Sequence, residues 1–108
     1  MAKQNICGKF KVEMLVDIKE SWRPEKKLVA IFNTHAPVHF GARGYGNYEK
    51  YKAVNSVVAE SKRRSYIARH GATEDWTTPY SAGTLSQYIL WEFVGPNKVK
   101  KYNELFFR

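Results

Sequence analysis

The sequence is poor in cysteine, in acidic residues and in long apolar runs. Cys7 is the single cysteine among 108 residues, which excludes a disulfide within the chain and a structural zinc site built from several thiolates. No apolar run approaches the roughly 18 residues that span a membrane as a helix, and residues 1–7 lack the apolar core of a signal peptide. We therefore expect a protein of a reducing compartment that is neither secreted nor transmembrane.

Motifs of nucleotide-binding proteins and of named nucleic-acid-binding modules are also missing. The glycine-rich loop at residues 41–46 has neither the GxGxxG spacing nor the GK[ST] ending of a phosphate-binding loop. No RRM, KH or zinc-finger pattern occurs, and the sequence shows no internal repeat. We expect no cofactor, no metal site and no catalytic residue. The length predicts a single domain over residues 1–108, in which residues 1–8 form a flexible tail.

The chain is rich in positive charge and in aromatic side chains. Lys and Arg number 18 against 10 Asp and Glu, which gives a formal net charge of +8 and a pI near 9.7. Aromatic residues make up 15% of the chain, so much of the core must consist of rings. A positive surplus of this size favours polyanionic partners, namely DNA, RNA, or an acidic protein or membrane surface.

The N-terminal part of the sequence shows the pattern of an antiparallel sheet. Apolar residues occupy alternate positions over residues 10–18, which predicts a half-buried strand with Met14, Val16 and Ile18 on one face. After a turn, the compact apolar run at residues 27–33 predicts a second strand that is buried on both faces. Residues 38–40 predict a short third strand.

The middle of the chain has the composition of helices. Residues 48–70 contain neither Gly nor Pro and predict one long helix, or two short ones with a break at Asn55 and Ser56. A further helix, capped by Thr78 or Ser81, runs to about residue 93. It is apolar nearly all round, so we expect it to be the central buried helix.

The last predicted helix follows Gly95 and Pro96 and is amphipathic. Val99, Tyr102 and Phe106 fall on one face at the spacing i, i+3 and i+7. Because strands come first and helices after, the sequence predicts the α+β class. The expected architecture is an N-terminal antiparallel two- or three-stranded meander followed by three or four helices packed on one face.

The positive charge is concentrated in residues 43–70. Seven Lys or Arg stand there against two Glu, an excess of +5, and tyrosines are interleaved with the cations. Cations beside aromatic rings suit phosphate contact and base stacking. The alternative is a solvated helix face with the tyrosines in the core. The residues predicted to bind nucleic acid, from this segment and from the last helix, are Arg43, Tyr45, Lys50, Lys52, Lys62, Arg63, Arg64, Arg69, Lys98 and Lys101.

His70 is followed by two carboxylates, Glu74 and Asp75. Such a set could hold a divalent metal or act as an acid–base pair, as a metal-dependent nuclease requires. The spacing matches no nuclease motif, and a histidine at a helix C-terminus is a favourable partner of the helix dipole. We therefore interpret the protein as a non-enzyme.

The chain carries an ordered series of short motifs between residue 25 and its C-terminus. They are His39-Phe40-Gly41, Gly44-Tyr45 with Tyr48, Tyr66-Ile67-Ala68-Arg69-His70, Trp76, Pro79, Ser81-Ala82-Gly83 and Tyr88-Ile89-Leu90-Trp91. This series resembles a family of small uncharacterised proteins encoded by large double-stranded DNA viruses of protists and algae. The resemblance implies a viral origin, with a location in the cytoplasm or nucleus of the host cell or in the virion. It implies no catalytic residue.

Charge and resemblance together lead to two hypotheses from different classes. In the first, a small basic viral protein binds DNA or RNA through a surface rich in Lys, Arg and Tyr, in association with the genome or the virion. In the second, the protein is a minor structural component of the virion that cements larger capsid or core proteins. A metal-dependent nuclease is the third alternative. The expected partners are nucleic acid and viral structural proteins, and no membrane.

Overall fold

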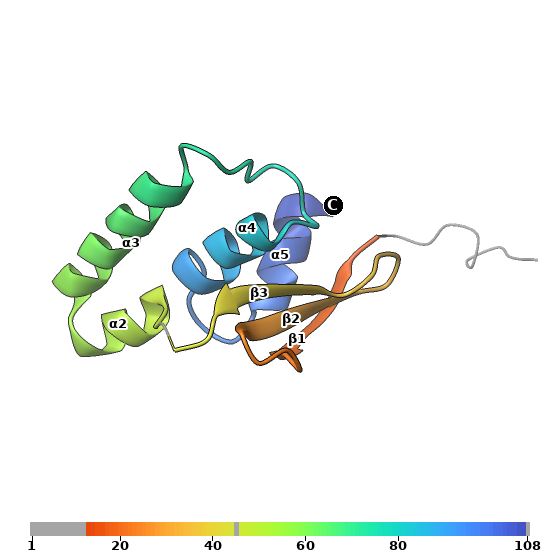
Figure 1. Ribbon diagram of the computed structural model, residues 1–108, viewed down its shortest axis with the longest axis horizontal. Coiled ribbons are helices and arrows are strands. Elements are labelled where there is room, and N and C mark those ends of the chain that lie inside the picture. Colours follow the sequence, from red (N-terminus) through yellow and green to blue (C-terminus); the bar gives the residue numbers. More distant parts are fainter. Residues whose placement is uncertain (1–12, 45, 108) are drawn as a thin grey trace, which may run out of the picture.

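The computed structural model describes residues 13–44 and 46–107 and has strands first and helices after (Figure 1). The strands are β1 (Leu15–Glu20), β2 (Lys26–Phe32) and β3 (Val38–Ala42). The helices are α2 (Tyr48–Val54), α3 (Ser56–His70), α4 (Ala82–Leu85), the π-helix η1 (Ser86–Leu90) and α5 (Lys98–Phe106). The predicted α+β class is confirmed. The tail predicted at residues 1–8 lies outside the described residues.

The sheet is an antiparallel meander in the order β1-β2-β3. The central strand β2 pairs with both neighbours, so that Leu28 stands between Glu20 of β1 and Phe40 of β3. Within β2, Val29 and Ala30 are adjacent and both fully buried, which confirms a strand covered on both faces. The second and third predicted strands are thus present where the apolar runs placed them.

The first strand differs from its prediction in position and in face. It begins at Leu15, and the first three positions of the predicted strand lie outside the described residues. Leu15 is buried, whereas Met14 and Val16 are 39% and 52% exposed. The cause is a β-bulge, because the register with β2 shifts between Leu15 and Asp17 and leaves Val16 as an extra residue. The bulge places Leu15 and Ile18 against the same core, which strict alternation cannot predict.

The hydrophobic core lies between the sheet and the C-terminal helices. Its buried members are Leu15, Ala30, Phe32 and Phe40 from the sheet, and Leu85, Ile89, Leu90 and Tyr102 from the helices. The fully buried Tyr102 satisfies its hydroxyl by donating to the carbonyl of Pro79 at 2.6 Å. Val99 and Phe106 pack against the same cluster, so the amphipathic stripe predicted for the last helix is confirmed.

The buried helix predicted to end near residue 93 is built from α4 and η1. Ser81 caps it, because its hydroxyl accepts a hydrogen bond from the N–H of Thr84 at 3.1 Å. The helix then widens to π geometry and closes with a bond from the N–H of Phe93 to the carbonyl of Tyr88 at 2.8 Å. Leu85, Ile89 and Leu90 are buried here, which confirms the central position of this helix.

Helices α2 and α3 form an arm that stands apart from the sheet (Figure 1). The predicted break at Asn55 is confirmed, since Asn55 ends α2 and its side-chain oxygen caps α3 by accepting from the N–H groups of Val57 and Val58. Only Ala59 and Tyr66 of α3 are buried. The arm is therefore not one of the helices that cover the sheet. Among the described residues, no helix is long and apolar enough to cross a membrane.

Candidate functional site

A cleft of about 720 Å³ separates the α2–α3 arm from the sheet and the central helix. Its lining comes from β2, β3, α2, α3, α4 and η1, so the cleft forms only where the sheet, the arm and the central helix come together. Gly41 at the end of β3 lies in its wall with a φ of +80°. A Cβ at this position would come within 3.0 Å of Leu90 and 3.2 Å of Lys27, so glycine allows the sheet and the central helix to meet here.

The cleft is strongly cationic. Lys26 and Lys27 of β2 and Lys62 and Arg69 of α3 line it, and Glu74 is the one carboxylate among the described lining residues. Within residues 13–44 and 46–107, Lys26, Lys62 and Arg69 take part in no ion pair. Among the described residues, no carboxylate lies close enough to these three cations to form an ion pair with them.

Lys27 is partly buried and lies within reach of other positive charges. Burial, and then the neighbouring charges of Lys50 and Lys98, lower the pKa of Lys27 below its ordinary value. Like charges that approach one another in this way repel, and an anion placed among them relieves the repulsion. The electrostatics of the cleft thus favour a negatively charged ligand.

One face of α3 is turned toward the cleft. The lining residues Lys62, Ser65, Tyr66, Arg69 and His70 follow the spacing i, i+3, i+4, i+7 and i+8, which is a single helical face. This face combines two cations with a tyrosine and a histidine. The sequence predicted Lys62 and Arg69 as binding residues, and the structure brings these two together in the cleft.

Parallel aromatic rings form the second component of the cleft. Trp91 lies between Tyr66 and Tyr51, with ring centroids 5.0 and 6.2 Å away and interplanar angles of 18° and 22°. Trp76 extends the series beyond Tyr66 at 6.3 Å and 8°. The ammonium of Lys62 lies 5.5 Å from the ring centre of Tyr51. Burial raises the pKa of Tyr66 to about 12, so this ring stays neutral at physiological pH.

His70 and Glu74 form a pair at one end of the cleft. Nδ1 of His70 lies 2.6 Å from Oε2 of Glu74, whose other oxygen accepts from the indole N–H of Trp76 at 2.9 Å. Gly83 makes room for this carboxylate, since a Cβ there would lie 2.6 Å from Glu74. Asp75 is not part of the pair, because its carboxylate accepts from the N–H and hydroxyl of Thr77. Among the residues that the structure describes, no three His, Cys, Asp or Glu side chains come together to hold a metal ion.

Two predicted binding residues instead hold the sheet and the arm in place. Arg43 bonds to the carbonyls of the β1–β2 turn and pairs with Glu20 at 3.2 Å. Arg63 pairs with Glu92 and with Glu60, which ties α3 to the end of the central helix. The guanidinium groups of Arg43 and Arg63 are thus largely occupied by ion pairs and hydrogen bonds within the molecule.

The two predicted lysines of α5 are also engaged. Lys98 donates to the carbonyl of Ile89 at 3.0 Å and pairs with Glu49 of α2 at 3.1 Å. The hydrogen bond from Lys98 is the main cause of a lowered pKa at Glu49. Lys101 donates to the carbonyl of Val94 at 2.7 Å. Lys98 connects α5 to η1 and α2, Lys101 connects α5 to the preceding loop, and both ammonium groups are thus engaged within the molecule.

Four predicted binding residues remain, three cations and one tyrosine. Lys50, Lys52 and Arg64 are exposed on the arm but do not line the cleft. Tyr45 lies outside the described residues. Sequence reasoning missed Lys26 and Lys27, which stand at the start of a strand that was interpreted only as core.

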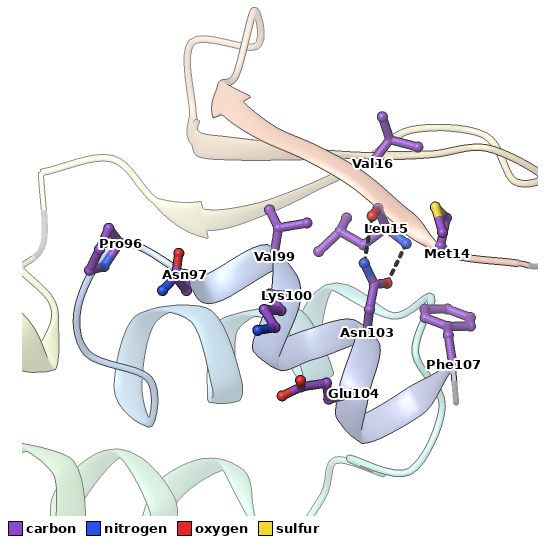
Figure 2. A pocket seen from close by; sticks show the side chains of 10 residues that line it. All are labelled: Met14, Leu15, Val16, Pro96, Asn97, Val99, Lys100, Asn103, Glu104 and Phe107. Atoms are coloured by element: carbon purple, nitrogen blue, oxygen red, sulfur yellow. Dashed lines mark hydrogen bonds between the residues drawn. The ribbon is translucent and has the colours of Figure 1, made fainter.

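A second groove of about 750 Å³ runs between β1 and α5 (Figure 2). It is lined by apolar side chains such as Val99 and Phe107, together with one cation, Lys100, and one carboxylate, Glu104. Because these charges balance, this groove lacks the electrostatic character of the cleft. We therefore take the cleft as the candidate site.

Fold and site together define a small α+β protein with a cationic, aromatic-lined cleft between a three-stranded sheet and a helical arm. Residues 16–70 match the model of a family described as a family of unknown function (DUF5754). The match covers just over half of the chain, so the chain belongs to this family. It spans the sheet and the arm, including Lys26, Lys27, Lys62 and Arg69, and ends before α4. Searches of curated proteins and of solved structures gave no match.

Proposed function

We propose that the protein binds nucleic acid in the cleft between the sheet and the α2–α3 arm. The observation that carries this proposal is the convergence of Lys26, Lys27, Lys62 and Arg69 on one concave surface with a single lining carboxylate, Glu74. Phosphate contacts supply most of the affinity in such complexes, and a cationic groove with aromatic rings is the usual design for binding without sequence preference.

The residues of the cleft take different parts in this proposal. Lys62 and Arg69 are exposed on one face of α3 and contact the phosphate backbone from the side of the arm. Lys26 and Lys27 contact it from the side of the sheet. Tyr51 and Trp91 lie in the wall of the cleft, where a ring can pack against a sugar or a base. Viral origin and an association with a genome or virion remain predictions that rest on the sequence resemblance.

Salt dependence of binding tests the proposal. If each of the four cations meets one phosphate, log Kd for a single strand changes with log salt at a slope of about 2.8, and for duplex DNA at about 3.6. The affinity for a single strand then falls roughly 50-fold between about 50 and about 200 mM salt. Fluorescence anisotropy with labelled single- and double-stranded DNA and RNA measures these slopes. The proposal is contradicted if none of these four nucleic acids binds at low salt, or if the affinity does not change with salt concentration.

A further inference from the structure

Trp22 is a strongly exposed aromatic side chain. It lies in the turn between β1 and β2 and is 65% exposed. Among the Trp, Tyr and Phe side chains of residues 13–44 and 46–107, it alone is classed as exposed. Its sequence neighbours Arg23, Pro24 and Glu25 are exposed too, so the ring does not belong to an apolar patch.

The turn that carries Trp22 is braced by the side chain of Arg43. Its guanidinium donates to the carbonyl of Pro24 at 2.9 Å, to that of Ser21 at 3.0 Å and to that of Arg23 at 3.3 Å. The hydroxyl of Ser21 also accepts from the N–H of Arg23 at 3.0 Å. A turn held by this many hydrogen bonds fixes the backbone around Trp22, so little backbone entropy remains to be lost when a ligand contacts the ring.

One side of the Trp22 environment is also fixed. The indole meets the ring of His39 edge to face, at 4.6 Å and 90°, and Nδ1 of His39 is hydrogen-bonded to the hydroxyl of Ser21 at 2.7 Å. Partial desolvation, and then the charge of Arg23, lower the pKa of His39, so this ring is neutral at neutral pH. Most of the Trp22 side chain nevertheless stays accessible.

The turn is continuous with the cleft. The N–H of Lys26 donates to the carbonyl of Arg23 at 3.2 Å, and the Lys26 side chain lines the cleft. Lys26 pairs with Ala42, which places the turn at the end of the sheet where β3 leads into the arm (Figure 1). The turn that carries Trp22 therefore leads directly into a strand whose first residue lines the cleft.

We propose that Trp22 is a stacking platform for an unpaired base, so that the ligand of the cleft is a single-stranded nucleic acid. This inference rests on the proposed function and specifies its substrate class. In a duplex the base faces are covered by neighbouring base pairs, whereas an unpaired base offers a free face to an aromatic ring. The exposed indole stands in a turn that contains Arg23 and leads into Lys26, so this part of the chain provides the combination of ring and cation that single-strand-binding proteins use.

The test compares Trp22→Ala and Trp22→Phe with the wild-type protein on an oligothymidylate of about 12 nucleotides and on a duplex of the same length. Loss of one stacked base weakens single-strand binding by roughly 5- to 150-fold in Trp22→Ala, whereas Trp22→Phe retains part of the affinity. The duplex affinity stays within about twofold. Leu105→Ala, which truncates another exposed apolar side chain on α5, is the matched control and leaves both affinities unchanged. Quenching of tryptophan fluorescence by the oligonucleotide decreases in Trp22→Phe.

The outcomes separate this inference from the proposed function. If Trp22→Ala binds the single strand as tightly as the wild type while the salt dependence persists, the stacking role is wrong and the cleft proposal stands. If the wild-type protein binds neither strand form, both are wrong. If Trp22→Ala abolishes binding to anionic phospholipid vesicles but leaves oligonucleotide affinity unchanged, the indole is a membrane contact and the inference is overturned.

Discussion

At the scale of single residues, the cations of this protein serve two purposes. Arg43 and Arg63 form several hydrogen bonds and ion pairs within the chain and stabilise its fold. Lys62 and Arg69 are exposed at the cleft without an ion pair among the described residues. Net charge therefore overstates the number of cations that a ligand can meet.

Gly41 is the residue on which the shape of the cleft wall depends most directly. Gly41→Ala places a side chain at a φ of +80° and brings its Cβ within 3.0 Å of Leu90. We expect a loss of about 2–4 kcal/mol in the free energy of unfolding, from backbone strain together with overpacking. Denaturation with urea, followed by circular dichroism, measures it.

Gly44→Ala is the control for this substitution. Gly44 also has a positive φ, +95°, but a Cβ there would meet nothing within 4 Å. Gly44→Ala should lower the free energy of unfolding by about 1–2 kcal/mol, from backbone strain alone. Equal losses in the two variants would show that the contact with Leu90 has no energetic importance.

At the scale of elements, the contact between β1 and α5 joins the first strand of the fold to its last helix. Asn103 of α5 accepts from the N–H of Leu15 at 2.7 Å and donates to the carbonyl of Leu15 at 2.9 Å (Figure 2). The side-chain amide thus pairs with the edge of β1 as a neighbouring strand would, next to the bulge at Val16. It joins residues 88 positions apart in the sequence.

Truncation of Asn103 tests this connection. Asn103→Ala leaves the N–H and the carbonyl of Leu15 without their partner, and we expect a loss of about 1–3 kcal/mol in the free energy of unfolding. Asn97→Ala is the control, because Asn97 directly precedes the same helix and its side chain makes no capping hydrogen bond. Chemical denaturation of both variants gives the comparison. A loss that is no greater for Asn103→Ala than for Asn97→Ala would contradict this role.

The elements also show how far the sequence could predict the structure. The break at Asn55 and the cap at Ser81 were predictable, because capping is a local property of short polar side chains. The face that β1 turns toward the core could not be predicted, because the bulge at Val16 depends on pairing with β2. For the same reason Lys26 and Lys27 were missed. They line a cleft only because the arm, which begins at Tyr48, folds to the opposite side of that cleft from β2.

At the scale of the whole molecule, the arm and the body are held together around the cleft. Glu49 of α2 pairs with Lys98 and accepts from the N–H of Gly95, and Arg63 of α3 pairs with Glu92. The stacked rings of Tyr66 and Trp91 join the same two parts. These contacts hold the two cationic walls in a fixed relation, which makes the cleft a preorganised site.

The central claim is that the position of the charges in the cleft, and not the net charge of the protein, determines nucleic-acid binding. The variant Lys62→Glu/Arg69→Glu reverses two cations that line the cleft. The variant Lys52→Glu/Arg64→Glu reverses two exposed cations that lie on the same arm but do not line the cleft. Both variants have the same net charge, so any difference between them reports position alone.

Fluorescence anisotropy with a single-stranded oligonucleotide over a range of salt concentrations makes this comparison directly. For Lys62→Glu/Arg69→Glu we predict an affinity reduced by about 100-fold at low salt and a salt slope reduced by about 1.4, the contribution of two phosphate contacts. For Lys52→Glu/Arg64→Glu we predict an unchanged slope and an affinity within about threefold of the wild type. Equal losses in the two variants would show that net charge governs binding, and would contradict a specific role for the cleft.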